Sequence, residues 1–318
     1  MLVYNITKEH PKAPFMGGGP VGMAYETDEF FVHYYISEWN SPFGGLRPQQ
    51  RIYQRKKGTL EDWVVNAFGA ENVRECVHSA GETIKGVWRP GISSQADIGN
   101  LKSDVGNWAR AQVILLKKLS EIFDFVEPKG SGLNAYSHKT RELLILACTE
   151  VENYWTYYLR ASGNVEARLS TNDYVKLKET LYLSDFEIQR DRLGLPSVSP
   201  FDGWDSTQPT RSLPWYDAYN KVKHNRDRDF ELATVENCIN SVAGALVLFA
   251  SRFGPSQLNG NINVLSGLFN ELFSMQLKEI DPKTYYLPKI EIEDPGHDDA
   301  VSGHSDRGAI FEIKNFTL

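Results

Sequence analysis

The stretch VENCINSVAGALVLFASRFGP, from Val235 to Pro255, has the clearest helical pattern in the chain. Its apolar residues recur at steps of three and four, which places them on one face of an α-helix. The Gly254-Pro255 pair ends the pattern, because neither residue readily continues a helix. We therefore predict a buried helix whose apolar stripe consists of Val235, Cys238 or Ile239, Val242, Leu246, Phe249 and Phe253.

Two longer segments upstream show the same period. The first runs from Ser94 to Val126 and the second from Ser137 to Ala161. Because only residues 127–136 connect them, we expect these two helices to be antiparallel neighbours. Shorter helices are predicted at residues 59–69, 71–87, 170–182 and 262–277.

The two ends of the chain lack this helical period. The first 58 residues contain the aromatic run FFVHYYI, from Phe30 to Ile36, which predicts a strand within an irregular arm. The β-like runs KIEIE and AIFEIKNF lie in residues 278–318. We therefore predict a mainly α fold. An antiparallel helical bundle over residues 59–277 would follow an irregular, partly β N-terminal arm (1–58) and precede a short β-like C-terminal tail (278–318).

Composition narrows the class of protein. With 318 residues, 41% of them hydrophobic, the chain is long enough to bury a substantial core. Its formal net charge of -7 argues against coating of duplex DNA, which requires a broadly basic surface. The three cysteines are widely spaced and odd in number, so we expect thiols in a reducing cytoplasm rather than disulfides or a zinc site. No apolar run approaches the length of a membrane span, and no secretory signal is visible, so we predict a cytoplasmic protein.

The segment WYDAYNKVKHNRDRDF, from Trp215 to Phe230, concentrates the chemistry of the chain. On a helix, Asn220 and His224 are four residues apart and share one face with Tyr216. An imidazole beside an amide and a phenol can act on a proton. This strip is therefore the candidate catalytic site.

Basic residues surround the strip and suggest an anionic ligand, most simply a phosphate group. They are Lys221, Lys223, Arg226 and Arg228. The alternative is an ordinary amphipathic helix whose charged face lies in water. In that case Asp217, Asp227, Asp229 and Glu231 would neutralise much of the basic charge.

Glu150 and Glu152, in LACTEVENYW, differ from the other acids of the chain. Glu150 falls at the border of the apolar stripe of the 137–161 helix, and an acid at such a border usually has a partner. That partner would be a basic group or the imidazole of His224 if the two helices pack together. Alternatively, Glu150 is a rim carboxylate paired with Lys139, Arg141 or water.

An acid in the middle of a long helix, followed by an Asn-x-x-x-His segment and an apolar final helix, resembles the HEPN (higher eukaryotes and prokaryotes nucleotide-binding) all-α domain. The resemblance covers residues 94–253. It places Asn220 on the asparagine and His224 on the histidine of the family motif, whereas Tyr219 occupies the position of the motif arginine. Family members commonly form their site across a homodimer, and many are metal-independent ribonucleases of toxin and defence systems.

The resemblance implies one of two functions. The first is a cytoplasmic endoribonuclease without metal or cofactor, with His224 as acid/base and Asn220 as orienting group. RNA phosphate would then lie against Tyr219, Lys221, Lys223 and Arg226, and Glu150 and Tyr216 would support the site. The second is an inactive HEPN-like scaffold that dimerises or binds a nucleotide or a protein partner. The tyrosine at the arginine position favours the scaffold, because a phenol is a weaker, neutral donor to phosphate.

Overall fold

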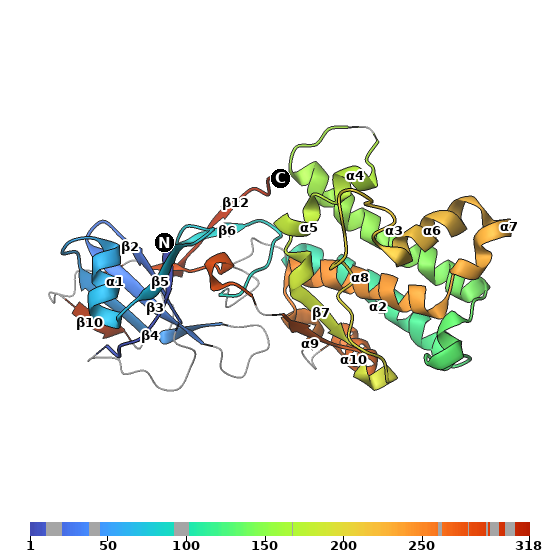
Figure 1. The fold of residues 1–318 in the computed structure, drawn as a ribbon, viewed down its shortest axis with the longest axis horizontal. Helices are drawn as coiled ribbons and strands as arrows, with labels where there is room; N and C mark the ends of the chain where they lie inside the picture. Colours follow the sequence, from blue (N-terminus) through green and yellow to red (C-terminus); the bar gives the residue numbers. More distant parts are fainter. Residues whose placement is uncertain are drawn as a thin grey trace. The chain divides into compact units, whose positions relative to one another are not determined.

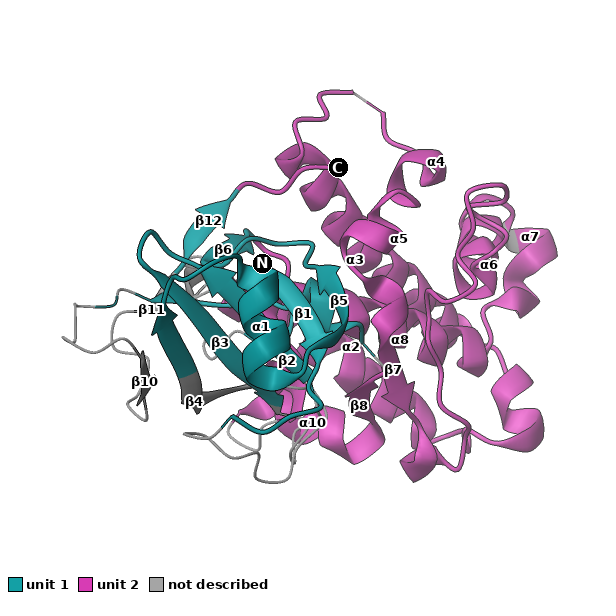
Figure 2. Ribbon diagram, turned by 60° about the vertical axis from the view of Figure 1, so that its left-hand side comes forward, with its two compact units in different colours: residues 1–85, 89–99, 280–314 teal, residues 86–88, 100–279, 315–318 magenta. Residues whose placement is uncertain are grey.

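The computed structural model describes residues 1–10, 21–37, 45–91, 102–166, 168–259, 263–278, 280–290, 292, 299–302 and 309–318. The chain forms two compact units (Figure 2). Unit 1 comprises residues 1–85, 89–99 and 280–314, and unit 2 comprises residues 86–88, 100–279 and 315–318. Unit 1 is built on β-sheet and unit 2 on helices.

A six-stranded antiparallel sheet forms the centre of unit 1, in the order β10-β4-β3-β2-β1-β5. Its strands are β1 (Leu2–Asn5), β2 (Val21–Glu26), β3 (Phe30–Ser37), β4 (Gly45–Arg55), β5 (Glu71–Glu75) and β10 (Asp299–Ser302). The predicted strand at residues 30–36 is therefore present as β3. It lies in the interior of the sheet and is not part of an irregular arm.

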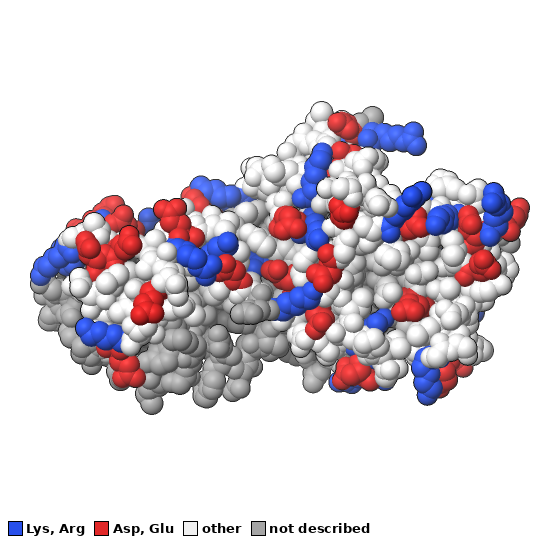
Figure 3. Space-filling model, viewed as in Figure 1, with Lys and Arg blue, Asp and Glu red and all other residues white. Residues whose placement is uncertain are grey.

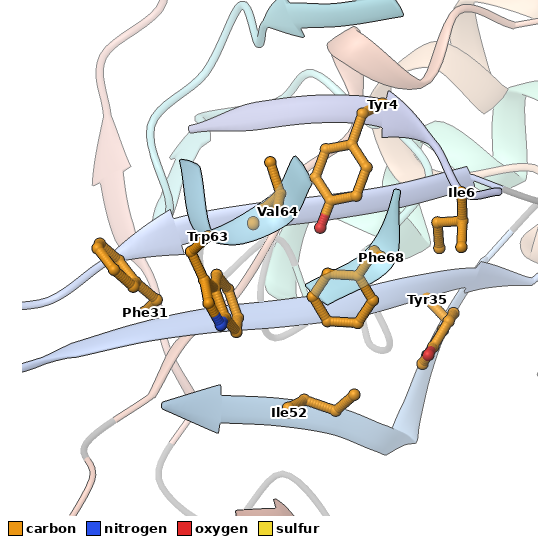
Figure 4. Packing of buried hydrophobic residues seen from close by; sticks show 9 residues of the cluster. Tyr4, Ile6, Phe31, Tyr35, Ile52, Trp63, Val64 and Phe68 are labelled. Carbon is orange, nitrogen blue, oxygen red and sulfur yellow. The ribbon is translucent and has the colours of Figure 1, made fainter. Parts of the chain in front are cut away.

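Helix α1 (Leu60–Phe68) covers one face of this sheet (Figure 4). Thr59 caps it by accepting a hydrogen bond from the Asp62 backbone, and Gly69 ends it in the left-handed conformation at φ 58°. The helix buries Trp63, Val64 and Phe68 against Tyr4, Ile6, Ala24, Phe31, Tyr35 and Ile52. The helix predicted at residues 59–69 is thus confirmed, but it belongs to the β unit.

The opposite face of the sheet is covered by the returning C-terminal segment. Tyr285, Leu287 and Ile290 pack there against Val3, Met23, Tyr25, Val32, Tyr34 and Ile36. Both faces of β3 are therefore buried, which explains why its sequence is almost continuously aromatic and apolar.

Further short elements tie the C-terminal segment into unit 1. The strand β12 (Glu312–Lys314) runs parallel to β6 (Glu82–Ile84), and β11 (Ala309–Ile310) pairs with β9 (Lys289–Ile290). The 3-10 turn η6 (Pro282–Thr284) precedes β9, β11 and β12 in the sequence. Residues 280–314 are thus assigned to unit 1.

The principal helices of unit 2 are α2 (Lys102–Phe123), α3 (His138–Ala161), α6 (Pro214–His224), α8 (Val235–Phe253) and α10 (Val264–Leu272) (Figure 1). Helix α8 contacts α2, α3 and α6, and sixteen of its residues are buried, which confirms the helix predicted from residue 235. Ser137 and Thr140 form a capping box at the start of α3. The 3-10 turn η2 (Gly130–Asn134) lies between α2 and α3.

Shorter elements complete unit 2. They are α4 (Thr171–Tyr174), α5 (Leu177–Thr180), η3 (Leu183–Asp185), η4 (Asp191–Leu193), α7 (Arg226–Asp229), η5 (Phe230–Leu232) and α9 (Ser256–Asn259). The strand β7 (Phe186–Gln189) pairs antiparallel with β8 (Ser274–Leu277). No helix in the described ranges combines the length and apolar character needed to cross a membrane.

The prediction of a mainly α fold is wrong, because a complete sheet unit stands beside the helical one. The helix predicted at residues 71–87 is also wrong, since this segment forms β5 and β6. Strand β5 is mostly exposed and is held by pairing with β1, in which Leu2 lies opposite Glu75. Such pairing overrides the local pattern from which the helix was predicted.

Candidate functional site

Helix α6 carries the predicted site and is anchored by its aromatic residues. Pro214 occupies its first turn, where the missing N–H is not needed. The Trp215 ring packs against Gly244 of α8, where a Cβ atom would lie only 3.2 Å from the ring. Its indole nitrogen donates to the Pro200 carbonyl at 3.3 Å. The glycine therefore sets how closely α6 approaches α8.

Glu152 of α3 is the acid that meets α6. It accepts a hydrogen bond from the Tyr216 hydroxyl at 2.6 Å and one from the Tyr219 hydroxyl at 3.3 Å. The Lys223 ammonium donates to the Tyr219 hydroxyl at 2.7 Å and lies 4.9 Å from the centre of that ring. We call these four residues the Glu152 network.

The hydrogen-bond donors of the Glu152 network remain protonated near pH 7. Burial, together with the hydrogen bond to Glu152, raises the pKa of Tyr216 far above its usual range. Burial also raises the pKa of Tyr219. The hydrogen bond to Tyr219 raises the pKa of Lys223. Because all three pKa values move away from neutrality, these groups fix a pattern of hydrogen bonds and do not exchange protons near pH 7.

An aromatic layer beneath the network fixes the Tyr216 ring. Trp155 is fully buried and stacks on Trp204, with ring centres 4.8 Å apart. The same indole meets Tyr174 at 5.0 Å and the Tyr216 ring edge at 5.1 Å. These rings form part of the core of unit 2 and leave no open face for a stacking base.

His224, the predicted acid/base group, is the last residue of α6 and is exposed to solvent. It makes no hydrogen bond or ion pair with the described residues. The amide nitrogen of Asn220 donates to the Tyr216 carbonyl at 3.0 Å, one turn back along the helix. The two residues share a face as predicted, but the Asn220 amide group is directed to the backbone.

The basic residues around His224 are partly neutralised. Lys221 forms an ion pair with Asp217 at 2.6 Å, and Lys223 belongs to the Glu152 network. The side chain of Arg226 lies outside the described part of the chain. On the face shown in Figure 3, acidic and basic side chains are interspersed over α6 and α7. The region is therefore a mixed surface and not a uniformly basic one.

Glu150 is half-buried, and burial raises its pKa. Its carboxylate accepts a hydrogen bond from Asn153 at 3.2 Å on its own helix. Lys139, one of its expected partners, instead pairs with Glu121. The acid that contacts α6 is Glu152, two positions further on, where the α3 surface faces α6.

The spacing of residues on α3 could have identified Glu152. It lies four residues after buried Cys148 and three before buried Trp155, so it shares their strip. Glu150 lies about 200° around the helix from Glu152, since each residue turns the chain by about 100°. Tyr216, which we predicted to support the site, donates its hydrogen bond to Glu152.

Comparisons with protein-family models, with curated proteins and with solved structures find no match for this chain. Within the described residues, no group of three or more His, Cys, Asp and Glu side chains is arranged to hold a metal ion.

Proposed function

We propose that this protein is a catalytically silent binding scaffold with a HEPN-like helical unit. The observation that supports this proposal is the burial of Tyr219, whose side chain has no exposed surface. Its hydroxyl is engaged by Glu152 and by Lys223 inside the Glu152 network. In the family resembled, an arginine at this position would hold the phosphate. A buried phenol bonded to a carboxylate does not offer that charge to a substrate.

The ligand we propose is a nucleotide or a short RNA whose phosphate lies at the C-terminal end of α6. Lys223 and His224 are both exposed there, and each can donate to a phosphate oxygen. The acids interspersed on α6 and α7 favour a small anionic ligand over a long duplex, which would meet their negative charge. We place the protein in a reducing cytoplasm, in keeping with its three free cysteines.

The second candidate function is a metal-independent endoribonuclease. It is favoured by the exposure of His224 and by the absence of an ion-pair partner for its ring among the described residues. General acid/base cleavage requires one group that accepts a proton and one that donates it. In the family resembled, a second copy of the chain commonly supplies the other imidazole, so we expect this function to require a homodimer.

One experiment separates the two functions. Purified protein is incubated in EDTA with a fluorescent single-stranded RNA, and binding and cleavage are both recorded. The scaffold predicts saturable binding without cleavage, and weaker binding for Lys223→Gln and His224→Ala. Lys129→Gln is the matched control, because Lys129 is an exposed lysine on a different part of unit 2. Cleavage by the parent protein that is lost in His224→Ala would overturn the scaffold proposal, and unchanged binding in both variants would overturn the proposed ligand site.

A further inference from the structure

Arg252, on α8, is a buried charge that the described residues supply with too few hydrogen-bond acceptors. Its side chain has no exposed surface, and its Nε, Nη1 and Nη2 atoms have no hydrogen-bond partner among the described residues. A guanidinium carries five N–H donors in one plane. Leaving them unpaired in a protein interior costs several kcal/mol, so buried arginines normally meet a carboxylate, a carbonyl or a bound anion.

Aromatic rings surround the guanidinium and compensate part of its lost hydration. The Cζ atom lies 3.8 Å from the ring centre of Tyr157 and 5.1 Å from that of Trp108. Phe253 and Tyr158 complete the cage at 5.1 Å and 5.9 Å. Cation–π attraction stabilises the positive charge. The Tyr158 hydroxyl also interacts with the guanidinium. The ring faces themselves provide no oxygen acceptor for the other in-plane N–H groups.

The carboxylate of Asp104, on the first turn of α2, lies near this group. Its Oδ2 atom lies 3.8 Å from Nη2 of Arg252, which is beyond hydrogen-bond distance. The Asp104 side chain is 56% exposed, although the arginine beside it is fully buried. An exposed carboxylate on the first turn of α2 therefore lies beside the Nη2 atom of Arg252.

We propose that Arg252 is the anchor of an oxyanion-binding site between α2 and α8, which takes a carboxylate or a phosphate group of a small ligand. The ligand would displace the loosely held Asp104 carboxylate and accept two parallel hydrogen bonds from the guanidinium fork. Asp104 therefore competes with the ligand for the guanidinium of Arg252. This site is separate from the Glu152 network and does not depend on the proposed RNA ligand.

The test is saturable stabilisation of the full chain by small oxyanions. Thermal unfolding is followed by circular dichroism while inorganic phosphate or acetate replaces chloride at constant ionic strength. The two anions show whether phosphate or carboxylate is preferred. A ligand that binds only the folded state raises the unfolding temperature in a saturable manner. We expect such a rise for the parent protein with at least one of the two anions.

Variants identify the site. Asp104→Asn is expected to lower the half-saturating anion concentration about fivefold, because it removes a competing ion pair of ordinary surface strength. Asp124→Asn removes an exposed acid just after the end of α2 and should behave like the parent. Arg252→Met should abolish the saturable rise. Arg252→Lys keeps the charge but loses the fork, so it should respond more weakly than the parent.

Three results would overturn the proposal. The first is a parent protein that responds to phosphate and acetate no differently from chloride. The second is an Arg252→Lys or Arg252→Met variant that keeps the full saturable response. The third is an Asp104→Asn variant with unchanged half-saturation, which would show that the anion binds away from this carboxylate.

Discussion

Tyr216→Phe tests whether the Glu152 network is a structural element of unit 2. The substitution removes the hydroxyl that donates to Glu152 at 2.6 Å and leaves the ring in its contact with Trp155. A hydrogen bond to a charged group contributes about 1.5–3 kcal/mol to stability. Glu152 is only half-buried and retains the Tyr219 hydroxyl at 3.3 Å, so we expect the lower end of this range, about 1.5 kcal/mol.

The assay is urea unfolding followed by circular dichroism at 222 nm, which reports chiefly on unit 2 because the long helices lie there. With an m-value of about 2–3 kcal/mol/M, the loss corresponds to a midpoint about 0.5–0.75 M lower. Tyr136→Phe is the matched control, because Tyr136 is 50% exposed and its hydroxyl makes no hydrogen bond to the described residues. Equal midpoints for the two variants would refute a stabilising role for the network.

Three further predictions concern the cores of the two units. Gly22→Ala should destabilise unit 1 by about 1–3 kcal/mol, because the new Cβ atom would lie 2.6 Å from Cε1 of His33. An unchanged melting temperature of the variant would contradict this packing of Gly22 against His33. Burial lowers the pKa of His33 well below 6.5 and that of His78 to about 4, so both are neutral when folded. The neutral imidazoles contribute fully to the stability of unit 1 above pH 6.5, and this contribution is lost as the pH falls toward 4. The loss is at most about 1.4 kcal/mol per pH unit for each histidine. Equal urea midpoints for unit 1 at pH 7 and pH 5 would contradict the burial of the two neutral rings. Leu144→Ala should cost about 2–5 kcal/mol because that side chain is fully buried, whereas Leu146→Ala on the same helix, at 37% exposure, should cost far less; similar values for the pair would show that α3 is oriented differently.

The helices of unit 2 were predictable because their signals are local. The three-and-four spacing of α3 and α8, the Ser137 cap and the Gly254-Pro255 stop all lie within a few residues of the structure that they specify. The common face of Asn220 and His224 follows in the same way from helix geometry. The exposure of His224 and the burial of Tyr219 do not follow from helix geometry alone, because both depend on which side of α6 packs against α3 and α8.

The sequence alone therefore determined the long helices, their approximate ends and the strip of polar residues on α6. Only the tertiary structure decided that the ends of the chain join in one sheet unit, where β12 pairs with β6 across more than two hundred residues of sequence. It also decided that the strip of α3 that bears Glu152 packs against Tyr216 of α6, although helix spacing alone places Glu152 on a strip of buried residues. The physical reason is that hydrogen bonds within a helix join residues four apart, whereas strand pairing and side-chain contacts between helices join residues whose separation no local pattern records.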